Sequence, residues 1–406
     1  MEYLAGLTGP DVWEEYYRYC AGREHITQRE LKQMRRLLDE KAYLAPLRQW
    51  LDEGTFPTAE KRVINKMGSD KKRIVYTFDD ASNLLLKILA YHLHDYDGIF
   101  APNLFSFRVN SGVRKAMAYL TRRPDLSGKY VYKLDIHDYF NSVDVARILP
   151  MVNEQLASEP LLAGLIAEIL TNPRVRSDGA EIEERKGIMA GIPLSSFLAN
   201  LYLSELDRRM YEKGVLYARY SDDIIVFADS EEELAEHRDM ILSMLAERGL
   251  TVNPKKVSTA GPHEEWTFLG ISYRNGVMDV SKASVEKLKG KMRRKARMLY
   301  RRKCRNNETD ERAIRAYIRH YNHKFYDNRK ENELTWARWF FPVITTADSL
   351  AVLDRYMVSC IRFITTGRHC KANYRLRYDT IKEYGFRSLV HEYYLGHSEE
   401  NNQGED

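Results

Sequence analysis

Apolar residues recur at two different spacings along the chain, and changes in that spacing divide it into predicted helices and strands. Up to about residue 58 the apolar and aromatic positions follow helical spacing, as in Val12, Tyr16 and Tyr17. Thr27 with Glu30 three residues later is typical of the capping box that begins a helix. Residues 1–60 are therefore predicted to form an N-terminal helical segment that serves as scaffold.

Two basic, β-rich runs follow at residues 61–66 and 71–76, and the Gly-Ser-Asp turn between them predicts a β-hairpin. A basic hairpin can grip phosphate groups, but edge strands also carry lysine simply to prevent aggregation. The pattern leaves both interpretations open. Helical spacing then returns over residues 82–94 and through Met117 and Leu120.

Three carboxylates lie where β-rich runs end or turn. One predicted strand ends in Asp135, and residues 219–227 predict a strand, a tight turn and a second strand, with Asp222 and Asp223 at the turn. An exposed hairpin turn is the simpler interpretation of that pair, because aspartate is common in turns. If the strands are antiparallel neighbours, however, the acids share one edge and can hold two Mg²⁺ ions about 4 Å apart for phosphoryl transfer.

The rest of the pattern is mainly helical. A loop of small residues at 187–196 opens a helix at 197 that runs towards residue 211, and residues 266–273 predict two strands around a turn glycine. Beyond residue 281 the chain becomes helical and basic, which puts the predicted domain boundary near residue 280. The tail over 397–406 is polar and acidic and is predicted to be flexible.

Composition is that of a soluble globular protein, with 44% hydrophobic and 30% charged residues over 406 positions. The four cysteines show neither metal-binding spacing nor a paired pattern. No apolar run approaches the length of a membrane span, and the N-terminus lacks the apolar core of a signal peptide. We therefore expect a soluble, cytoplasmic protein with no membrane partner.

The distribution of charge is more informative than the net charge of +5. The run over residues 287–305 is rich in lysine and arginine and contains no acid; its members include Lys291, Arg294, Arg297 and Arg301. A basic block on a globular chain favours a nucleic-acid partner. A solvated helix face explains the same run equally well.

Five short motifs, in order along the chain, resemble those of reverse transcriptases, and the resemblance covers most of the chain. They are residues 135–140, residues 191–196 with Ala199 and Asn200, the Tyr-x-Asp-Asp box at 220–223, residues 253–256, and residues 268–270. The resemblance implies an α+β fold with right-hand polymerase architecture. Fingers and palm, with an antiparallel catalytic sheet packed on helices, would span 61–280, and a basic helical thumb and C-terminal region would span 281–396.

The activity implied by this resemblance is that of an RNA-directed DNA polymerase, which adds dNTPs to a 3′-hydroxyl with two Mg²⁺ ions, for which Mn²⁺ can substitute. The implied catalytic and metal-binding residues are Asp135, Ile136, Asp222 and Asp223. Lys256 is the implied proton donor to the pyrophosphate leaving group. Lys255 competes for that role, and a solvated lysine pair is the simpler interpretation.

The resemblance also implies contacts with nucleotide and nucleic acid. Phe140 falls where the family has a bulky steric gate against the ribonucleotide 2′-hydroxyl, although a core aromatic is the simpler interpretation. The other implied nucleotide-binding residues are Lys72, Arg73, Pro193, Ser195 and Asn200. The implied nucleic-acid contacts are Arg108, Phe268, Leu269, Gly270 and the four named residues of the basic run. Arg108 and Asn200 could equally be structural.

Departures from the family pattern narrow the subgroup. Residues 194–196 read Leu-Ser-Ser where intron-encoded enzymes usually have a glutamine followed by glycines, and no maturase, RNase H or integrase domain is evident. The run over residues 366–378, with residues 384–389, resembles the C-terminal part of the unknown-group or defence-associated bacterial enzymes, and retron enzymes are the next closest. This implies antiphage defence in which a dedicated noncoding RNA is copied, with DNA product or primer and dNTPs as partners. A homo-oligomer or an accessory defence protein stays open.

Two other functions remain consistent with the residues. The protein could mainly bind RNA, with polymerisation weak or lost, although the intact acids argue against this. It could also be an untemplated or protein-primed DNA polymerase that uses the same metals, since the 27 tyrosines offer many hydroxyl groups.

Overall fold

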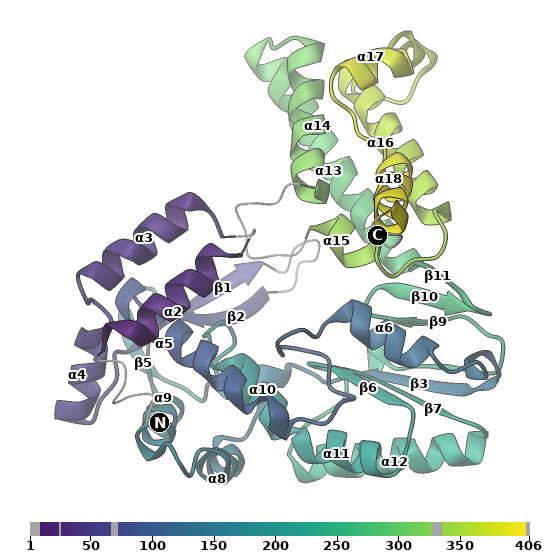
Figure 1. Ribbon diagram of the computed structural model, residues 1–406. Coiled ribbons are helices and arrows are strands. Elements are labelled where there is room, and N and C mark those ends of the chain that lie inside the picture. Colours follow the sequence, from purple (N-terminus) through teal and green to yellow (C-terminus); the bar gives the residue numbers. More distant parts are fainter. Residues whose placement is uncertain (1–8, 24–25, 66–71, 327–334, 403–406) are drawn as a thin grey trace. The chain divides into compact units, whose positions relative to one another are not determined.

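The computed structural model describes residues 9–23, 26–65, 72–326 and 335–402 (Figure 1). The chain divides into two compact units, Met1–Pro262 and His263–Asp406. This division comes earlier than the predicted boundary near residue 280, because the strands over 266–280 contact the helices that follow them. Helices and mainly antiparallel sheets make up the described residues, so the predicted α+β fold class is confirmed.

The described part of the first unit begins with three helices, in agreement with the predicted helical segment. They are α2 (Pro10–Ala21), α3 (Gln28–Asp39) and α4 (Leu44–Glu53), and all three contact α5 (Asp80–His92). The predicted capping box is present, since the Thr27 side chain accepts a hydrogen bond from Glu30 N and the Glu30 side chain accepts one from Thr27 N. The segment packs as a scaffold, with Leu31 and Leu38 buried on α3.

A four-stranded sheet contains the predicted basic hairpin. Its strands are β1 (Ala59–Asn65), β2 (Lys72–Thr77), β4 (Arg174–Ser177) and β5 (Ala180–Glu183), in the order β2-β1-β4-β5. β1 and β2 pair antiparallel, which confirms the hairpin, and β1 pairs in parallel with β4. The predicted turn, with Lys66 and Lys71 beside it, lies outside the described residues.

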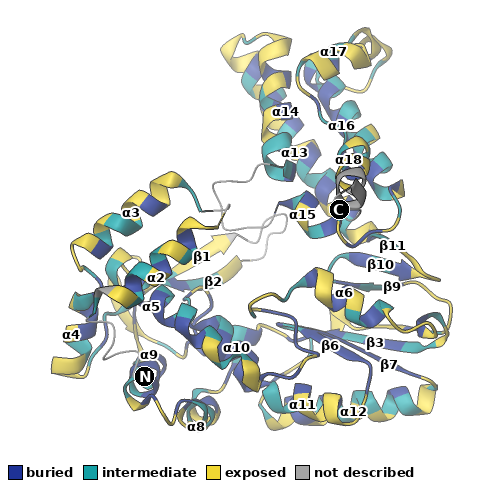
Figure 2. Cartoon of the chain, viewed as in Figure 1, coloured by how far each residue is buried: buried dark blue, intermediate teal, exposed yellow. Residues whose placement is uncertain are grey.

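A second sheet carries the acidic motifs. Its strands are β3 (Tyr130–Asp135), β6 (Tyr217–Tyr220), β7 (Asp223–Ala228) and β8 (Ser258–Ala260), in the antiparallel order β6-β7-β3-β8. Helices α11 (Ser204–Glu212) and α12 (Glu231–Glu247) lie along one face, and α6 (Val113–Thr121) lies on the other (Figure 1). Because both faces are covered, residues 224–228 of β7 are all buried (Figure 2).

Shorter helices complete the first unit. They are η1 (Leu93–Ile99), η2 (Leu126–Gly128), α7 (Tyr139–Ser142), α8 (Val145–Gln155), α9 (Pro160–Thr171), α10 (Ser195–Tyr202) and η3 (Pro254–Lys256). The helix predicted to run from residue 197 towards 211 is divided at Leu203 into α10 and α11.

The second unit joins a three-stranded sheet, in the order β11-β10-β9, to a helical region. Its elements are β9 (Trp266–Phe268), β10 (Ile271–Arg274), β11 (Val277–Val280), α13 (Lys282–Asn306), α14 (Asp310–Tyr326), α15 (Trp336–Phe340), α16 (Asp348–Thr366), η4 (Lys371–Arg375), α17 (Tyr378–Glu383) and α18 (Leu389–Asn402). The predicted pair of strands over 266–273 is confirmed. α18 extends into the segment predicted to be a flexible tail. No helix in the described ranges is long and apolar enough to cross a membrane.

Candidate active site

Three carboxylates meet at one edge of the β6-β7-β3-β8 sheet. Asp135 ends β3 and lies directly opposite Asp223, the first residue of β7, in the antiparallel register. Asp222 occupies the turn just before Asp223, and its carbonyl accepts a hydrogen bond from Ile136 N at 3.0 Å. The three acids are therefore neighbours, as the strand pattern predicted.

Two lysines share this edge with the acids. Lys256 Nζ pairs with Asp135 Oδ2, and Lys133 Nζ lies 3.8 Å from Asp223 Oδ1. Neither lysine forms an ion pair with Asp222 in the described part of the chain. Burial, with the charges of Asp135 and Asp223, raises the pKa of Asp222 to about 6. Burial also raises the pKa of Asp223, and the charge of Lys133 opposes that rise.

The raised pKa of Asp222 predicts that its ionised carboxylate destabilises the metal-free fold. Asp222→Asn should raise the melting temperature of chelator-treated protein by a few degrees, because the amide removes one of three adjacent charges. In the wild-type protein the ionised Asp222 carboxylate lowers the stability of the fold by its full amount above pH about 6. This destabilisation is absent below the ordinary pKa of 3.8, where the carboxyl is protonated in both the folded and the unfolded chain. The increase in melting temperature of Asp222→Asn over the wild-type protein, measured by calorimetry, should therefore become smaller as the pH falls from about 7 to about 4.

Asp229 provides the matched control, since it lies at the opposite end of the same strands. Its side chain is 77% exposed and pairs with Lys129. Asp229→Asn should not stabilise the protein. A gain that is equal in both variants, or independent of pH, would contradict the electrostatic explanation.

A buried ion pair supports the turn that carries Asp222. Arg219 on β6 donates to Asp207 Oδ1 at 2.8 Å and to Oδ2 at 2.5 Å, and both side chains are completely buried. The same guanidinium donates to the Ser221 carbonyl at 3.2 Å. Tyr217 OH donates to Asp207 Oδ1 at 3.0 Å. This network fixes the backbone immediately before the acids.

A second network holds the other side of the turn. Ser221 has a left-handed backbone with φ 59°, and its N–H donates to Ser106 Oγ at 2.8 Å. Ser106 Oγ donates to Asn200 Oδ1 at 3.1 Å, and Asn200 Nδ2 donates to the Ser106 carbonyl at 2.9 Å. Asn200 is fully buried. These contacts favour the structural interpretation of Asn200 over a direct contact with nucleotide.

Phe140, the predicted steric gate, lies on α7 just after β3. Its ring is half-buried and meets the rings of Phe107 and Tyr139 at centroid distances of 6.3 and 5.8 Å. Ile188 N donates to the Phe140 carbonyl at 2.9 Å. Gly187 has φ 54°, and a Cβ there would lie 2.2 Å from the same carbonyl oxygen, so only glycine allows the loop to approach so closely.

The same loop also contacts the strand that carries the predicted triphosphate-binding residues. Tyr76 N on β2 donates to the Ala190 carbonyl at 2.8 Å. Lys72 and Arg73 are exposed on β2. Pro193, further along the loop, is half-buried and lines a cavity of about 190 Å³. The loop over 187–193 therefore links α7 to the basic hairpin.

Two other predicted contact residues use their polar groups within the protein. The buried Ser195 hydroxyl has carbonyl acceptors at Ile188 and Met189, 2.7 and 2.6 Å away. The Arg108 guanidinium donates to three carbonyl oxygens within residues 97–104. These contacts favour a structural role for Arg108 and show how Ser195 shapes the loop.

The donor set at the sheet edge suits a hard divalent cation. Mg²⁺ and Mn²⁺ prefer carboxylate oxygens, and a cation would offset the burial and the repulsion that together raise the pKa of Asp222. Asp135 is turned towards Lys256, and within the described ranges no group of three or more His, Cys, Asp or Glu side chains is gathered to hold an ion. The ligands would be Asp135, once Lys256 releases it, with Asp222 and Asp223. Ile136 is buried and could contribute only its carbonyl.

The sequence profile of one known family, described as "Reverse transcriptase (RNA-dependent DNA polymerase)", matches residues 64–273, more than half of the chain. The chain belongs to the reverse transcriptase family. The matched residues include β2, which is the second strand of the basic hairpin, the three acids and Lys256.

Two curated proteins similar to this reverse transcriptase are retron enzymes. Retron Ec86 reverse transcriptase of Escherichia coli is 23% identical over 173 residues, and retron Mx65 reverse transcriptase of Myxococcus xanthus is 26% identical over 183. The alignments cover 42% and 43% of this chain and 50% and 43% of those proteins, so the chain spans half or less of the length of these relatives. The apo telomerase of Candida tropicalis, truncated from its C-terminal domain, matches 60% of each chain with a TM-score of 0.45 and 12% identity, too distant to add to the assignment.

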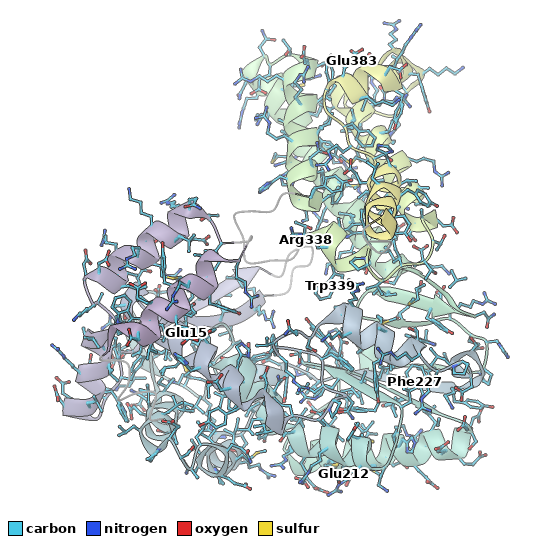
Figure 3. The ribbon with its side chains drawn as sticks, in the orientation of Figure 1. Glu15, Glu212, Phe227, Arg338, Trp339 and Glu383 are labelled. Carbon is cyan, nitrogen blue, oxygen red and sulfur yellow. The ribbon has the colours of Figure 1, made fainter. Side chains whose placement is uncertain are left out.

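The predicted primer grip of this reverse transcriptase lies in the second unit. Phe268 is fully buried at the end of β9, and Leu269 and Gly270 form a left-handed turn with φ of 52° and 84°. The Leu269 carbonyl accepts a hydrogen bond from Trp339 Nε1 at 3.2 Å (Trp339 is labelled in Figure 3). Ser284 Oγ would lie 2.9 Å from a Cβ at position 270, so glycine is needed there.

The predicted thumb helix, α13, has two distinct faces. Its buried face consists of Val285, Leu288, Met292, Ala296, Leu299 and Lys303. Arg294, Arg297 and Arg301 are exposed at helical spacing, whereas Lys291 is half-buried. Contact of this basic face with nucleic acid stays a prediction.

The sequence pattern gave no role to the buried residues that position the acids. Arg219 carried a detectable signal, because a charged residue in a short strand of buried apolar residues requires a partner. Asp207 carried no such signal in the sequence, since it is one of several acids on α11. Ser106 was also hidden, because it acts through a backbone N–H more than one hundred positions away.

Proposed function

We propose that this chain is an RNA-directed DNA polymerase that adds dNTPs to a 3′-hydroxyl and copies a dedicated noncoding RNA in bacterial antiphage defence, in the cytoplasm. The pairing of Asp135 with Asp223, beside Asp222, in a domain of the reverse transcriptase family carries the catalytic part of this proposal. Defence and the dedicated RNA are supported by the resemblance of residues 366–378 and 384–389 to defence-associated enzymes.

The chain's own residues account for most of the chemistry. Divalent cations, Mg²⁺ or Mn²⁺, would activate the 3′-hydroxyl and neutralise phosphate charge when bound. Asp135, Asp222 and Asp223 hold that positive charge at the sheet edge. Lys256 keeps its proton at Nζ and donates it to the departing pyrophosphate, a role supported by its contact with Asp135.

Charged residues away from the sheet edge bind the substrates. Lys72 and Arg73 bind the triphosphate through charge-assisted hydrogen bonds, which their exposure on β2 permits. The basic face of α13 binds backbone phosphates, so affinity for the template and primer should fall as salt rises.

The decisive experiment supplies the purified chain and its co-purifying RNA with Mg²⁺ and labelled dNTPs, and then sequences the product. DNA complementary to the RNA is the expected result. A homopolymer or random product would instead indicate untemplated synthesis. Bound RNA without any synthesis would overturn the polymerase assignment and leave RNA binding as the function.

The defence role is tested in cells challenged with phage. Protection by the wild-type chain should disappear with Asp222→Asn, because protection then depends on DNA synthesis. Undiminished protection by Asp222→Asn, at equal protein level, would show that binding alone suffices.

A retron-type enzyme is the second candidate, favoured by the similarity to the two retron reverse transcriptases. Such an enzyme would copy its own structured RNA. Chemical probing of the co-purifying RNA distinguishes the candidates, because the retron candidate requires that RNA to be folded around the copied region.

Phe140→Ala should increase ribonucleotide use relative to deoxyribonucleotide use by about 10- to 100-fold, because removal of the ring opens space for a 2′-hydroxyl. The measurement is the ratio of kcat/KM for dTTP and for UTP on one RNA template. The ratio matters more than the rate, since a loosened core would lower both rates together.

Phe78→Ala is the control for general loosening. Phe78 is another half-buried aromatic of the first unit, where its ring packs edge-on against Phe56 at 5.3 Å. It should leave the dTTP/UTP ratio unchanged. An unchanged ratio in Phe140→Ala would remove the gate role and leave Phe140 as a core aromatic.

A further inference from the structure

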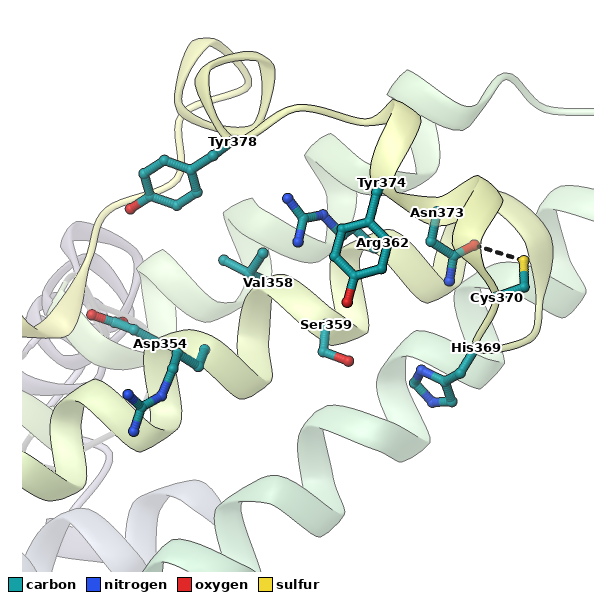
Figure 4. Close-up of a pocket in the computed structure, with 10 residues that line it drawn as sticks. Asp354, Val358, Ser359, Arg362, His369, Cys370, Asn373, Tyr374 and Tyr378 are labelled. Atoms are coloured by element: carbon teal, nitrogen blue, oxygen red, sulfur yellow. Dashed lines mark hydrogen bonds between the residues drawn. The ribbon is translucent and has the colours of Figure 1, made fainter.

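A cavity of about 680 Å³ lies in the C-terminal helical region of the second unit, and part of its lining comes from the run over residues 366–378. Its walls come from α16, η4 and the first turn of α17 (Figure 4). We call this cavity the Tyr374 pocket. Its lining includes Asp354, Arg355, Arg362, His369, Tyr374 and Tyr378. Such a volume is large enough for a nucleotide.

The chain around the Tyr374 pocket is strongly basic. Residues 355–378 contain no aspartate or glutamate; their basic residues are Arg355, Arg362, Arg368, Lys371, Arg375 and Arg377. Arg355 forms no ion pair or hydrogen bond with another described residue. A pocket with this charge favours an anionic ligand.

The one acid in the lining is already engaged. Asp354 accepts hydrogen bonds from Ser388 Oγ at 2.6 Å, Leu389 N at 2.9 Å and Val390 N at 3.2 Å. It thereby caps the start of α18 rather than presenting free acceptors to the cavity. Burial raises the pKa of this carboxyl as well. The two arginines of the lining, Arg355 and Arg362, therefore outnumber the one acid, whose oxygens are engaged within the fold.

Exposed aromatic rings add a second kind of contact. Tyr374 is 69% exposed, and the Arg362 guanidinium lies 4.8 Å from its ring centroid. Arg362 Nε donates to the Leu376 carbonyl at 3.2 Å, which fixes the guanidinium against the ring. Tyr378 is 40% exposed, with Lys382 Nζ 4.8 Å from its ring centroid. Aromatic rings beside cations are the platforms on which proteins stack unpaired bases.

We propose that the Tyr374 pocket binds an unpaired nucleotide of a single-stranded nucleic acid. The base stacks on Tyr374, and a backbone phosphate lies at Arg355. Bases inside a duplex are stacked and paired, so only an unpaired nucleotide can offer both contacts at once. The proposal rests on the proposed function in one respect, namely that the chain encounters nucleic acid.

The test measures equilibrium binding of a labelled twelve-nucleotide RNA and its DNA counterpart by fluorescence anisotropy. The full chain carries Asp222→Asn, and no dNTPs are added, so failure of polymerisation cannot affect the result. Tyr374→Ala should weaken binding at least about fivefold, and Tyr374→Phe should bind like the parent because it keeps the ring. Arg355→Ala should lower the slope of log affinity against log salt by about one.

Matched controls come from the same unit, outside the pocket lining. Tyr394 on α18 and Arg312 on α14 are likewise exposed, and their alanine variants should bind like the parent. A bromouridine in the RNA should crosslink to the peptide over 371–382. Crosslinks only elsewhere, or Tyr374→Ala and Arg355→Ala variants that bind like the parent, would overturn the proposal. AMP binding as tight as that of the RNA would also overturn it, by assigning the pocket to a free nucleotide.

Discussion

Asp135→Asn should reduce the rate of dNTP incorporation by about 10²- to 10³-fold or more, because it removes one of the three carboxylates proposed to hold the divalent cations. Its ion pair with Lys256 is half-exposed on the lysine side, so the free energy of unfolding should change by no more than about 1 kcal/mol. A large loss of rate without a loss of stability is therefore expected. Single-turnover primer extension and denaturant unfolding measure the two quantities.

Asp229→Asn again serves as the control, because it alters an acid of the same sheet at its far end. Its rate should stay within about twofold of the wild-type rate, as expected for an exposed surface substitution. If Asp135→Asn retained most of its activity, the sheet edge would not be the catalytic site. Activity lost in proportion to unfolding would equally contradict the assignment.

Asp207→Leu should lower the free energy of unfolding by about 3–5 kcal/mol, because it leaves the Arg219 guanidinium buried without its counter-ion. The double variant Asp207→Leu/Arg219→Met should regain much of that stability, since apolar pairs of similar volume often replace buried ion pairs without loss. Urea unfolding of the wild-type chain, the single variant and the double variant measures these differences.

The double variant also separates positioning from stability. It should remain slow in dNTP incorporation, because the hydrogen bond from Arg219 to the Ser221 carbonyl is gone and the acidic turn loses its support. The deficit should appear in kcat more than in KM, since the turn positions reacting groups rather than binding substrate. Full recovery of both stability and rate would exclude a positioning role for Arg219.

The catalytic sheet could be predicted from the sequence because its determinants are local. Runs of β-favouring residues mark β3, β6 and β7, and the acids stand where those runs end or turn. A short connection makes β6 and β7 antiparallel neighbours. The position of β3 beside them stayed a condition of the prediction, and the structure meets it by pairing Asp135 with Asp223.

The contacts that support the site could not be predicted, because they join side chains that are distant in sequence. Lys256 reaches Asp135 across 121 positions, and Ser106 reaches the N–H of Ser221 across 115. Local patterns hold no information on such pairs. Asn200 is an example of a role that such distant contacts change. Its motif suggests a contact with substrate, whereas its side chain forms hydrogen bonds within the protein.

The predicted domain boundary near residue 280 differs from the division into compact units for a related reason. The strands β9, β10 and β11 resemble the earlier strands in composition, so the change in pattern near residue 280 suggested that they belong with the first unit. Their packing places them in the second unit instead, where β11 contacts α16. Which helices a strand packs against is a tertiary property that the change in composition does not reveal.

The two lysines at the acidic edge determine the charge balance of the folded chain before any cation binds. Lys256 and Lys133 oppose three carboxylates, so the excess is a single negative charge, and Asp222 is the acid with which neither lysine pairs among the described residues. The folded chain therefore supplies two positive charges of its own to the three carboxylates. If a divalent cation binds here as proposed, it would take the place of the Lys256 ammonium at Asp135. A shortage of divalent cations would then leave folded chains without their cation, rather than unfolded chains.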